Sequence, residues 1–130
     1  YILPMPSLLA IFFIALGGAA GALLRFGVGG YVQHRAAMTL PIGTFAVNIA
    51  GCLALGFCYI WLERAPESWR LGVQVGLLGA LTTFSTFSLE ALRLLNAQRF
   101  VAAGAYLGAS VVLGLVAAWL GMIAGRGLLA

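Results

Sequence analysis

The chain has 130 residues, of which 63% are hydrophobic and only 8% are charged. That charged share is about a third of the share usual in soluble domains, which argues against a soluble globular fold. The formal net charge of +4 comes from seven arginines and three glutamates, without lysine. Because the arginines are scattered singly and nucleic-acid-binding proteins cluster them on one face, most are expected to be anchors at a membrane interface.

Four stretches contain no charged residue: 1–24, 36–62, 71–89 and 100–125. Each is near or above the roughly 20 residues that a helix needs to cross a bilayer core. We therefore expect an all-α membrane protein, with residues 1–130 forming a single domain of four transmembrane helices. The helices are predicted at about 8–30, 41–62, 71–95 and 100–125, joined by linkers 31–40, 63–70 and 96–99.

The first charge-free stretch is interpreted as a transmembrane helix. It lacks the basic segment that opens a cleavable signal peptide, and it continues through a glycine-rich run to Arg25. The guanidinium of Arg25 has two candidate roles. It can extend to the lipid headgroups, or it can line an aqueous vestibule and raise the local concentration of anions.

The second stretch carries an amide, Asn48, seven residues after Pro41 and therefore about 10 Å into the span. Polar groups inside a membrane are costly unless they are satisfied, which makes Asn48 a functional candidate. Its amide can donate to an anion or bond a neighbouring helix, and the sequence leaves both open. Thr44 lies one turn earlier on the same face.

The third stretch contains the segment TTFSTFS at residues 82–88, with five hydroxyl side chains in seven residues. A continuous helix can absorb a few such hydroxyls by bonding them to the preceding turn. Five of them compete strongly with the backbone, so we predict an interruption near residue 83, the middle of this span. Irregular backbone at that depth lines a cavity or is buried in protein, and its freed carbonyls suit a bare cation.

Two phenylalanines and two further hydroxyls extend this polar set. Phe84 and Phe87 share a helix face, and the positive edges of aromatic rings can stabilise a small anion, although ordinary core packing is the alternative. Tyr106 and Ser110 lie one turn apart in the fourth span. An inventory of neutral donors with few carboxylates favours an anion path over a proton relay or a cation pump.

Charge placement bears on membrane orientation. Arg64, Arg70 and Arg126 are expected on one side, opposite Arg35, Arg93, Arg99 and, near its helix end, Arg25. Such a balance gives no clear orientation, so the chain is a candidate for dual topology and an antiparallel dimer. Glycines four residues apart in three of the four helices permit close packing within a bundle or between subunits. Glu90 and Arg93 are expected to form a local ion pair at i, i+3.

Three segments together resemble the Fluc (CrcB) fluoride channels of microbial membranes: GGAAGALLRF, GTFAVNIAG and GLLGALTTFSTFSLE. The resemblance covers essentially the whole chain. It implies a passive fluoride-selective channel that exports cytoplasmic fluoride across the cell inner membrane. It also implies an antiparallel, dual-topology homodimer with two pores and a central structural sodium ion.

The same resemblance assigns roles to individual positions. Arg25 is expected at the vestibule, and the backbone carbonyls of Gly79 and Thr82 are expected to hold sodium. The positions expected to line the fluoride pore are Asn48, Thr83, Phe84, Ser85, Phe87, Tyr106 and Ser110.

Other functions require groups that the sequence supplies poorly. A small multidrug-type antiporter or a fluoride/proton antiporter needs a titratable group in the membrane, and the only candidate, Glu90, is predicted near a helix end. An intramembrane protease needs a nucleophile with a buried histidine or a carboxylate pair, whereas His34 falls in a predicted linker. We therefore expect no enzymatic activity. A purely structural membrane subunit would leave Asn48 and the phenylalanine pair unexplained.

Overall fold

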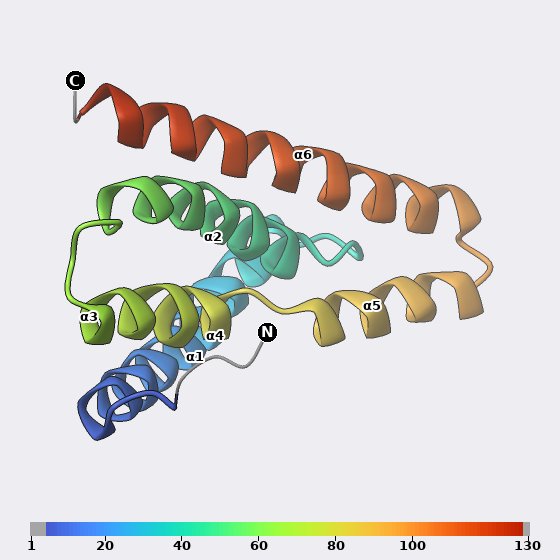
Figure 1. Cartoon of the computed structure of the whole chain (residues 1–130). Coiled ribbons are helices and arrows are strands. Elements are labelled where there is room, and N and C mark those ends of the chain that lie inside the picture. The colour runs from blue at the N-terminus through green and yellow to red at the C-terminus, as the bar shows by residue number, and fades with distance from the viewer. Residues whose placement is uncertain (1–4, 129–130) are drawn as a thin grey trace.

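The computed structural model describes residues 5–128, and all regular secondary structure in this range is helical (Figure 1). The elements are α1 (Leu8–Ala36), α2 (Ile42–Trp61), α3 (Glu67–Leu71), the π-helix η1 (Gly72–Leu78), α4 (Gly79–Leu81), α5 (Phe84–Asn96) and α6 (Phe100–Gly127). Four helical stretches within these residues are long and apolar enough to cross a membrane: α1, α2, the stretch Glu67–Asn96, and α6. The predicted all-α chain with four apolar helices is confirmed.

Two helices extend beyond their predicted ends. α1 continues past residue 30 to Ala36, and the third span begins at Glu67 rather than residue 71. The predicted ends were set by the limits of the apolar runs. The helices are longer because backbone hydrogen bonding continues into the polar residues beyond those runs. Near the end of α1, the Arg35 guanidinium lies over the Tyr31 ring, 5.4 Å from its centroid. The helix ends at Ala36, and the next residue, Ala37, has a left-handed backbone with a φ of 48°.

Glycines set how closely the helices pack. α6 lies along α2, and α1 packs against the first half of the third span (Figure 1). A Cβ added at Gly56 would collide with the backbone of Ala118 on α6, and one added at Gly17 would collide with the backbone of Gly72. Bare backbone contact of this kind is how helices associate in lipid, where apolar area alone gives no driving force. By contrast, added Cβ atoms at Gly104 and Gly108 meet nothing within 4 Å.

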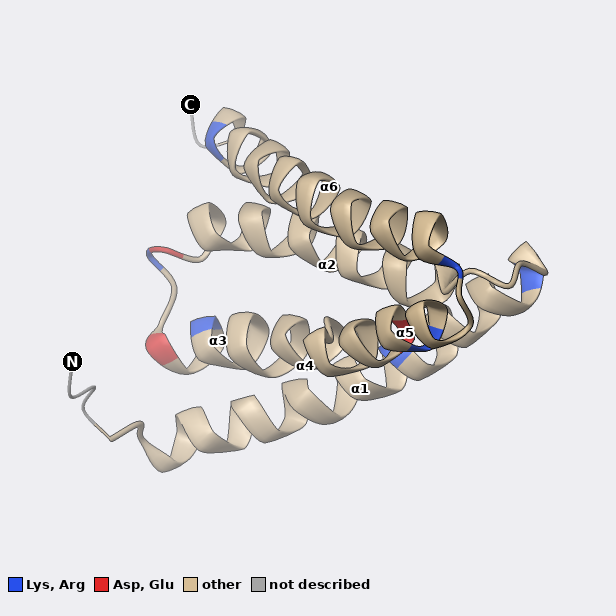
Figure 2. Ribbon diagram, turned by 90° about the vertical axis from the view of Figure 1, so that its right-hand side faces the viewer, with Lys and Arg blue, Asp and Glu red and all other residues tan. Residues whose placement is uncertain are grey.

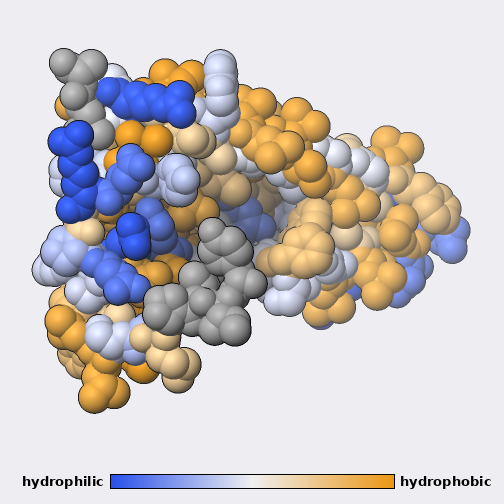
Figure 3. All heavy atoms as spheres, in the orientation of Figure 1, coloured by the Kyte–Doolittle hydropathy of each residue, from blue (hydrophilic) through white to orange (hydrophobic). Residues whose placement is uncertain are grey.

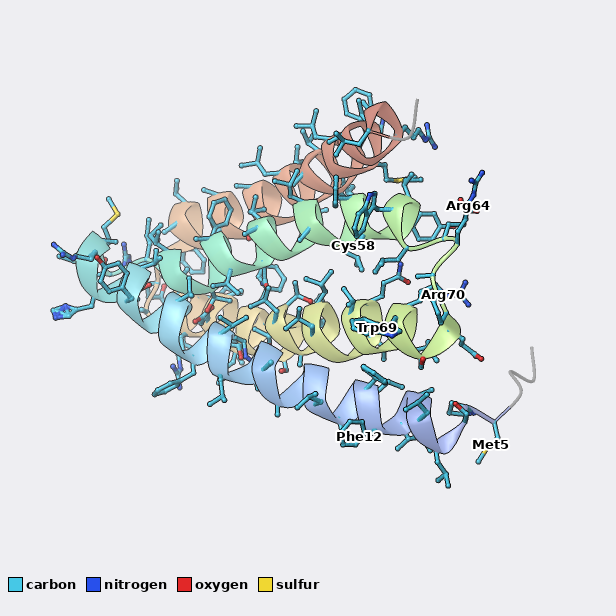
Figure 4. The ribbon with its side chains drawn as sticks, turned by 90° about the vertical axis from the view of Figure 1, so that its left-hand side faces the viewer. Met5, Phe12, Cys58, Arg64, Trp69 and Arg70 are labelled. Atoms are coloured by element: carbon cyan, nitrogen blue, oxygen red, sulfur yellow. The ribbon has the colours of Figure 1, made fainter. Side chains whose placement is uncertain are left out.

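Most charged residues gather toward the two ends of the bundle (Figure 2), whereas Arg25 lies within α1 and Glu90 lies within α5. Between the hydrophilic ends, the visible face is mostly hydrophobic (Figure 3). Arg64 and Arg70 lie at the same end as Met5 (Figure 4). The bundle therefore has the polarity that a membrane-spanning arrangement requires.

Two residues of the third span depart from helical geometry. Thr82 (φ −82°, ψ 150°) and Thr83 (φ −145°, ψ 116°) have extended backbones, so α4 ends at Leu81 and α5 begins at Phe84. Beyond this point α5 packs on α6 through one apolar cluster of Phe87, Ala91, Leu94, Ala103 and Tyr106. The two halves of the span thus have different neighbours, α1 for the first and α6 for the second.

Replacing Gly56 by alanine should loosen the α2–α6 contact. The new methyl group has no room against the Ala118 backbone, and overpacking of this kind costs about 1–3 kcal/mol. We expect a lower thermal unfolding temperature for Gly56→Ala in detergent. Gly18→Ala is the matched control, because nothing lies within 4 Å of the added atom and alanine favours a helix. Equal melting of both variants would contradict this packing account.

Candidate ion-binding site

A cleft of about 920 Å³ opens between α1, the start of α2 and α5. It is bounded by the linkers at one end of the bundle. The polar residues that bear on its chemistry are Arg25, Thr44, Thr83, Glu90, Arg93 and Arg99. Arginines, hydroxyls and one carboxyl group from three spans therefore face one opening.

The Asn48 amide is bound to the backbone of the third span. Its Oδ1 accepts from the Thr83 N–H at 2.8 Å, and its Nδ2 donates to the Thr83 carbonyl at 3.2 Å. Of the two roles open for Asn48, the bond to a neighbouring helix is present. One Nδ2 hydrogen remains uncommitted by these contacts, so the same amide retains a donor for a ligand.

Thr83 is a buried polar residue, with 8% of its surface exposed. It caps α5, because its Oγ1 accepts from the Thr86 N–H at 3.3 Å. The same hydroxyl donates to Thr86 Oγ1 at 3.1 Å and lies 3.3 Å from Ser85 Oγ. The crowded hydroxyls thus form a connected group at the start of α5, with Ser85 and Thr86 on its exposed side.

Glu90 differs from its expected role. Its Oε1 accepts from Thr44 Oγ1 and its Oε2 accepts from Tyr106 OH, both at 2.8 Å. The expected ion pair with Arg93 is wrong within the described residues. An exposed i, i+3 pair is worth only a few tenths of a kcal/mol, whereas a hydrogen bond to a charged group contributes about 1.5–3 kcal/mol. Glu90 therefore joins α2, α5 and α6.

The two phenylalanines are adjacent but differently exposed. Their ring centroids lie 5.7 Å apart with an interplanar angle of 45°. Phe87 is 8% exposed and packs 5.3 Å from the Tyr106 ring, whereas Phe84 is 81% exposed. Only Phe87 is thus held within this chain, and Phe84 projects from it.

Three other predicted site residues do not line the cleft. The Ser110 hydroxyl is buried and has no hydrogen-bond partner among residues 5–128. The Thr82 hydroxyl donates to the Leu78 carbonyl at 3.1 Å, and its methyl group lies where a Cβ on Gly51 would be. Gly79 is exposed, and a Cβ added there would meet only the Gln74 carbonyl, at 3.6 Å.

The cleft also brings together arginines that the sequence had not combined. Arg93 and Arg99 line it together with Arg25, and Arg99 donates from Nη1 to Thr39 Oγ1 at 2.9 Å. The sequence predicts Arg93 as the ion-pair partner of Glu90 and gives Arg99 no role in the site. The charge distribution along the sequence could have indicated this grouping, because it places Arg93 and Arg99 on the same side of the membrane as Arg25.

Four apolar helices and a polar cleft define a multi-pass α-helical membrane protein. The family profile described as "CrcB-like protein, Camphor Resistance (CrcB)" matches residues 12–122. The chain therefore belongs to this family, which confirms the resemblance seen in the sequence. Its relatives are channels and not enzymes.

Several curated relatives are similar over nearly their whole length. The "Fluoride-specific ion channel FluC" of Acidobacterium capsulatum is 42% identical over 120 residues, which cover 90% of this chain and 96% of the relative. The protein of the same name from Nitratidesulfovibrio vulgaris is 42% identical, with 89% and 96% covered. The one from Stutzerimonas stutzeri is 43% identical, with 88% and 95% covered.

Removing the Tyr106 hydroxyl should destabilise the protein. Tyr106→Phe keeps the ring contact with Phe87 but leaves Glu90 Oε2 without its donor, which costs about 1.5–3 kcal/mol. We expect a lower melting temperature in detergent. Tyr59→Phe is the matched control, because Tyr59 is 60% exposed on α2. A Tyr106→Phe variant as stable as the control would show that the Glu90 bridge contributes nothing.

Proposed function

We propose that this chain is a passive, fluoride-selective channel that exports cytoplasmic fluoride across the cell inner membrane. The observation that carries the proposal is the 42% identity to a relative named as a fluoride-specific ion channel, over 90% of this chain and 96% of the relative. The geometry of the site supports the same function. Neutral donors that include Thr44 and Thr83 line the cleft together with three arginines.

The proposed path uses donors in place of water. Fluoride is small and strongly hydrated, so a selective path must replace its hydration shell with hydrogen-bond donors. The free Nδ2 hydrogen of Asn48 and the hydroxyls of Ser85 and Ser110 are suited to this, whereas the Thr83 hydroxyl donates to Thr86 Oγ1. The arginines of the cleft raise the anion concentration at the entrance. Phe84 and Phe87 would present ring edges to the ion.

The working unit in this proposal is an antiparallel, dual-topology homodimer with two pores. Phe84, 81% exposed, and Ser85, also exposed, lie on a single chain without a wall opposite them. A second copy would supply that wall. The balanced arginine count on the two sides is consistent with insertion in both orientations.

A sodium ion is proposed at the interruption of the third span, held by the backbone carbonyls of Gly79 and Thr82. Carbonyl oxygens of irregular backbone are suitable ligands for a hard cation, so the donor set fits sodium. The open space beside Gly79 also suits the approach of an ion or of a second chain. Two carbonyls are too few to surround the ion, and a second copy would double them. The bound ion would supply a fixed positive charge between the two copies.

Proton-coupled antiport is the competing function, either of the small multidrug type or as fluoride/proton exchange. It requires a carboxylate that is protonated and released in each cycle. Among residues 5–128, Glu90 is the only carboxyl group that lines the cleft, and both of its oxygens accept hydrogen bonds from hydroxyls of neighbouring helices. That engagement favours a fixed structural role for Glu90 and supports passive transport.

Fluoride efflux from liposomes tests the proposal directly. Purified protein in vesicles loaded with fluoride should release it down its gradient without a proton gradient, because no coupled ion is needed. An ion-selective electrode measures the release, and chloride-loaded vesicles are the control for selectivity. Retention of fluoride, or release only with opposite proton movement, would rule out a passive channel.

The phenylalanines should matter for conduction. Phe84→Ile and Phe87→Ile remove the ring edges that would face the anion, so each should cut fluoride efflux by about tenfold or more. Because Phe84 is exposed, its variant should keep its fold, whereas Phe87→Ile also disturbs the contact with Tyr106. Phe12→Ile is the matched control, since Phe12 is 60% exposed on α1 (Figure 4). Unchanged flux in both site variants would remove the rings from the path.

A further inference from the structure

Two backbone N–H groups at the interruption bond to side chains instead of to the helix. In a continuous α-helix each N–H donates to the carbonyl four residues earlier. The Thr83 N–H would then reach the Gly79 carbonyl, but it donates to Asn48 Oδ1 at 2.8 Å. The Gly79 carbonyl therefore loses its helical donor.

The second diversion lies three residues later. In a continuous helix the Thr86 N–H would reach the Thr82 carbonyl. It donates instead to Thr83 Oγ1 at 3.3 Å, as the N-terminal cap of α5. The Thr82 carbonyl is thus also freed, because the Thr83 hydroxyl takes the N–H that would have bonded it.

We propose that Asn48 and Thr83 are positioning residues for the cation site. By accepting the N–H groups of Thr83 and Thr86, they release the carbonyls of Gly79 and Thr82 to bind a hard cation such as sodium. This inference rests on the proposed function, which assigns sodium to those two carbonyls. The new element is that two side chains, neither of which contacts the ion, determine the affinity of the site for sodium.

The contacts also connect the cation site to the anion path. Asn48 comes from α2, and the Thr83 segment that it holds joins the first half of the third span to the second. If Asn48 and the cation favour the same extended backbone, binding of the cation stabilises the Asn48 contact, and the contact strengthens binding in turn. The sodium dependence of protein stability therefore reports on the two hydrogen bonds, independently of fluoride conduction.

The test uses the Thr83 hydroxyl. Thr83→Val keeps the shape of the side chain but removes the acceptor, so the Thr86 N–H is free to return to the Thr82 carbonyl. Purified full-length protein is melted in detergent over a series of sodium chloride concentrations, with choline chloride keeping the ionic strength constant. Ligand binding to the folded state raises the melting temperature, so the midpoint of the rise measures sodium affinity.

We expect the sodium midpoint of Thr83→Val to be about 5- to 10-fold higher than that of the unchanged protein, the effect of losing one hydrogen bond. Thr83→Ser retains the hydroxyl and should restore the original midpoint. Ser88→Ala is the matched control, since Ser88 is exposed on the same helix and its hydroxyl bonds the Phe84 carbonyl. Asn48→Ala should raise the midpoint as well.

Several outcomes would overturn the inference. One is a Thr83→Val midpoint equal to that of the unchanged protein, and another is a Thr83→Ser midpoint as high as that of valine. A third is an unchanged protein with no sodium response. Liposome efflux separates these failures from failure of the channel itself, because unchanged protein that conducts fluoride supports the proposed function whatever the sodium midpoints are.

Discussion

The paired hydrogen bonds between the Asn48 amide and the Thr83 backbone determine the shape of the site. An extended residue in the middle of a membrane span has an N–H and a carbonyl without helical partners, and each would be costly to leave unsatisfied in lipid. Asn48 satisfies both from another helix. Because these two backbone groups are satisfied, α5 can begin at Phe84 and pack against α6, while the first half of the span packs against α1.

The same requirement for satisfied polar groups explains the contacts of the other polar side chains. Glu90 accepts a hydrogen bond from a hydroxyl on α2 and another from a hydroxyl on α6, and the Thr83 hydroxyl accepts from the Thr86 N–H in the first turn of α5. These hydrogen bonds hold the second half of the third span against its neighbouring helices, although few apolar residues are buried there. Glycine backbone contacts perform the corresponding role between α2 and α6. The bundle thus combines close backbone packing with a small number of polar connections.

The cleft and the residues around it fit the proposal that a second copy completes the site. Arg25, Arg93 and Arg99 face one opening, while Phe84 and Ser85 project outward from the chain. A second antiparallel copy would place an equivalent cleft on each side of the membrane, as the proposed double-pore dimer requires. Since electrostatic attraction at such an entrance acts on any anion, the proposed selectivity for fluoride would come from donors deeper in the proposed path.

The sequence by itself determined the number of spans and the residues of interest, because apolar run length and misplaced polar groups are local properties. The family resemblance rests on such local segments, and an interruption was predicted near residue 83, where Thr82 and Thr83 are extended. Only the tertiary structure decided which partners those residues have. The sequence paired Glu90 with nearby Arg93, but its hydroxyl partners come from positions 44 and 106, and helix packing alone brings them within 2.8 Å. Asn48 likewise contacts Thr83 only because α2 packs beside the third span. The spacing of the two residues along the chain does not predict that contact.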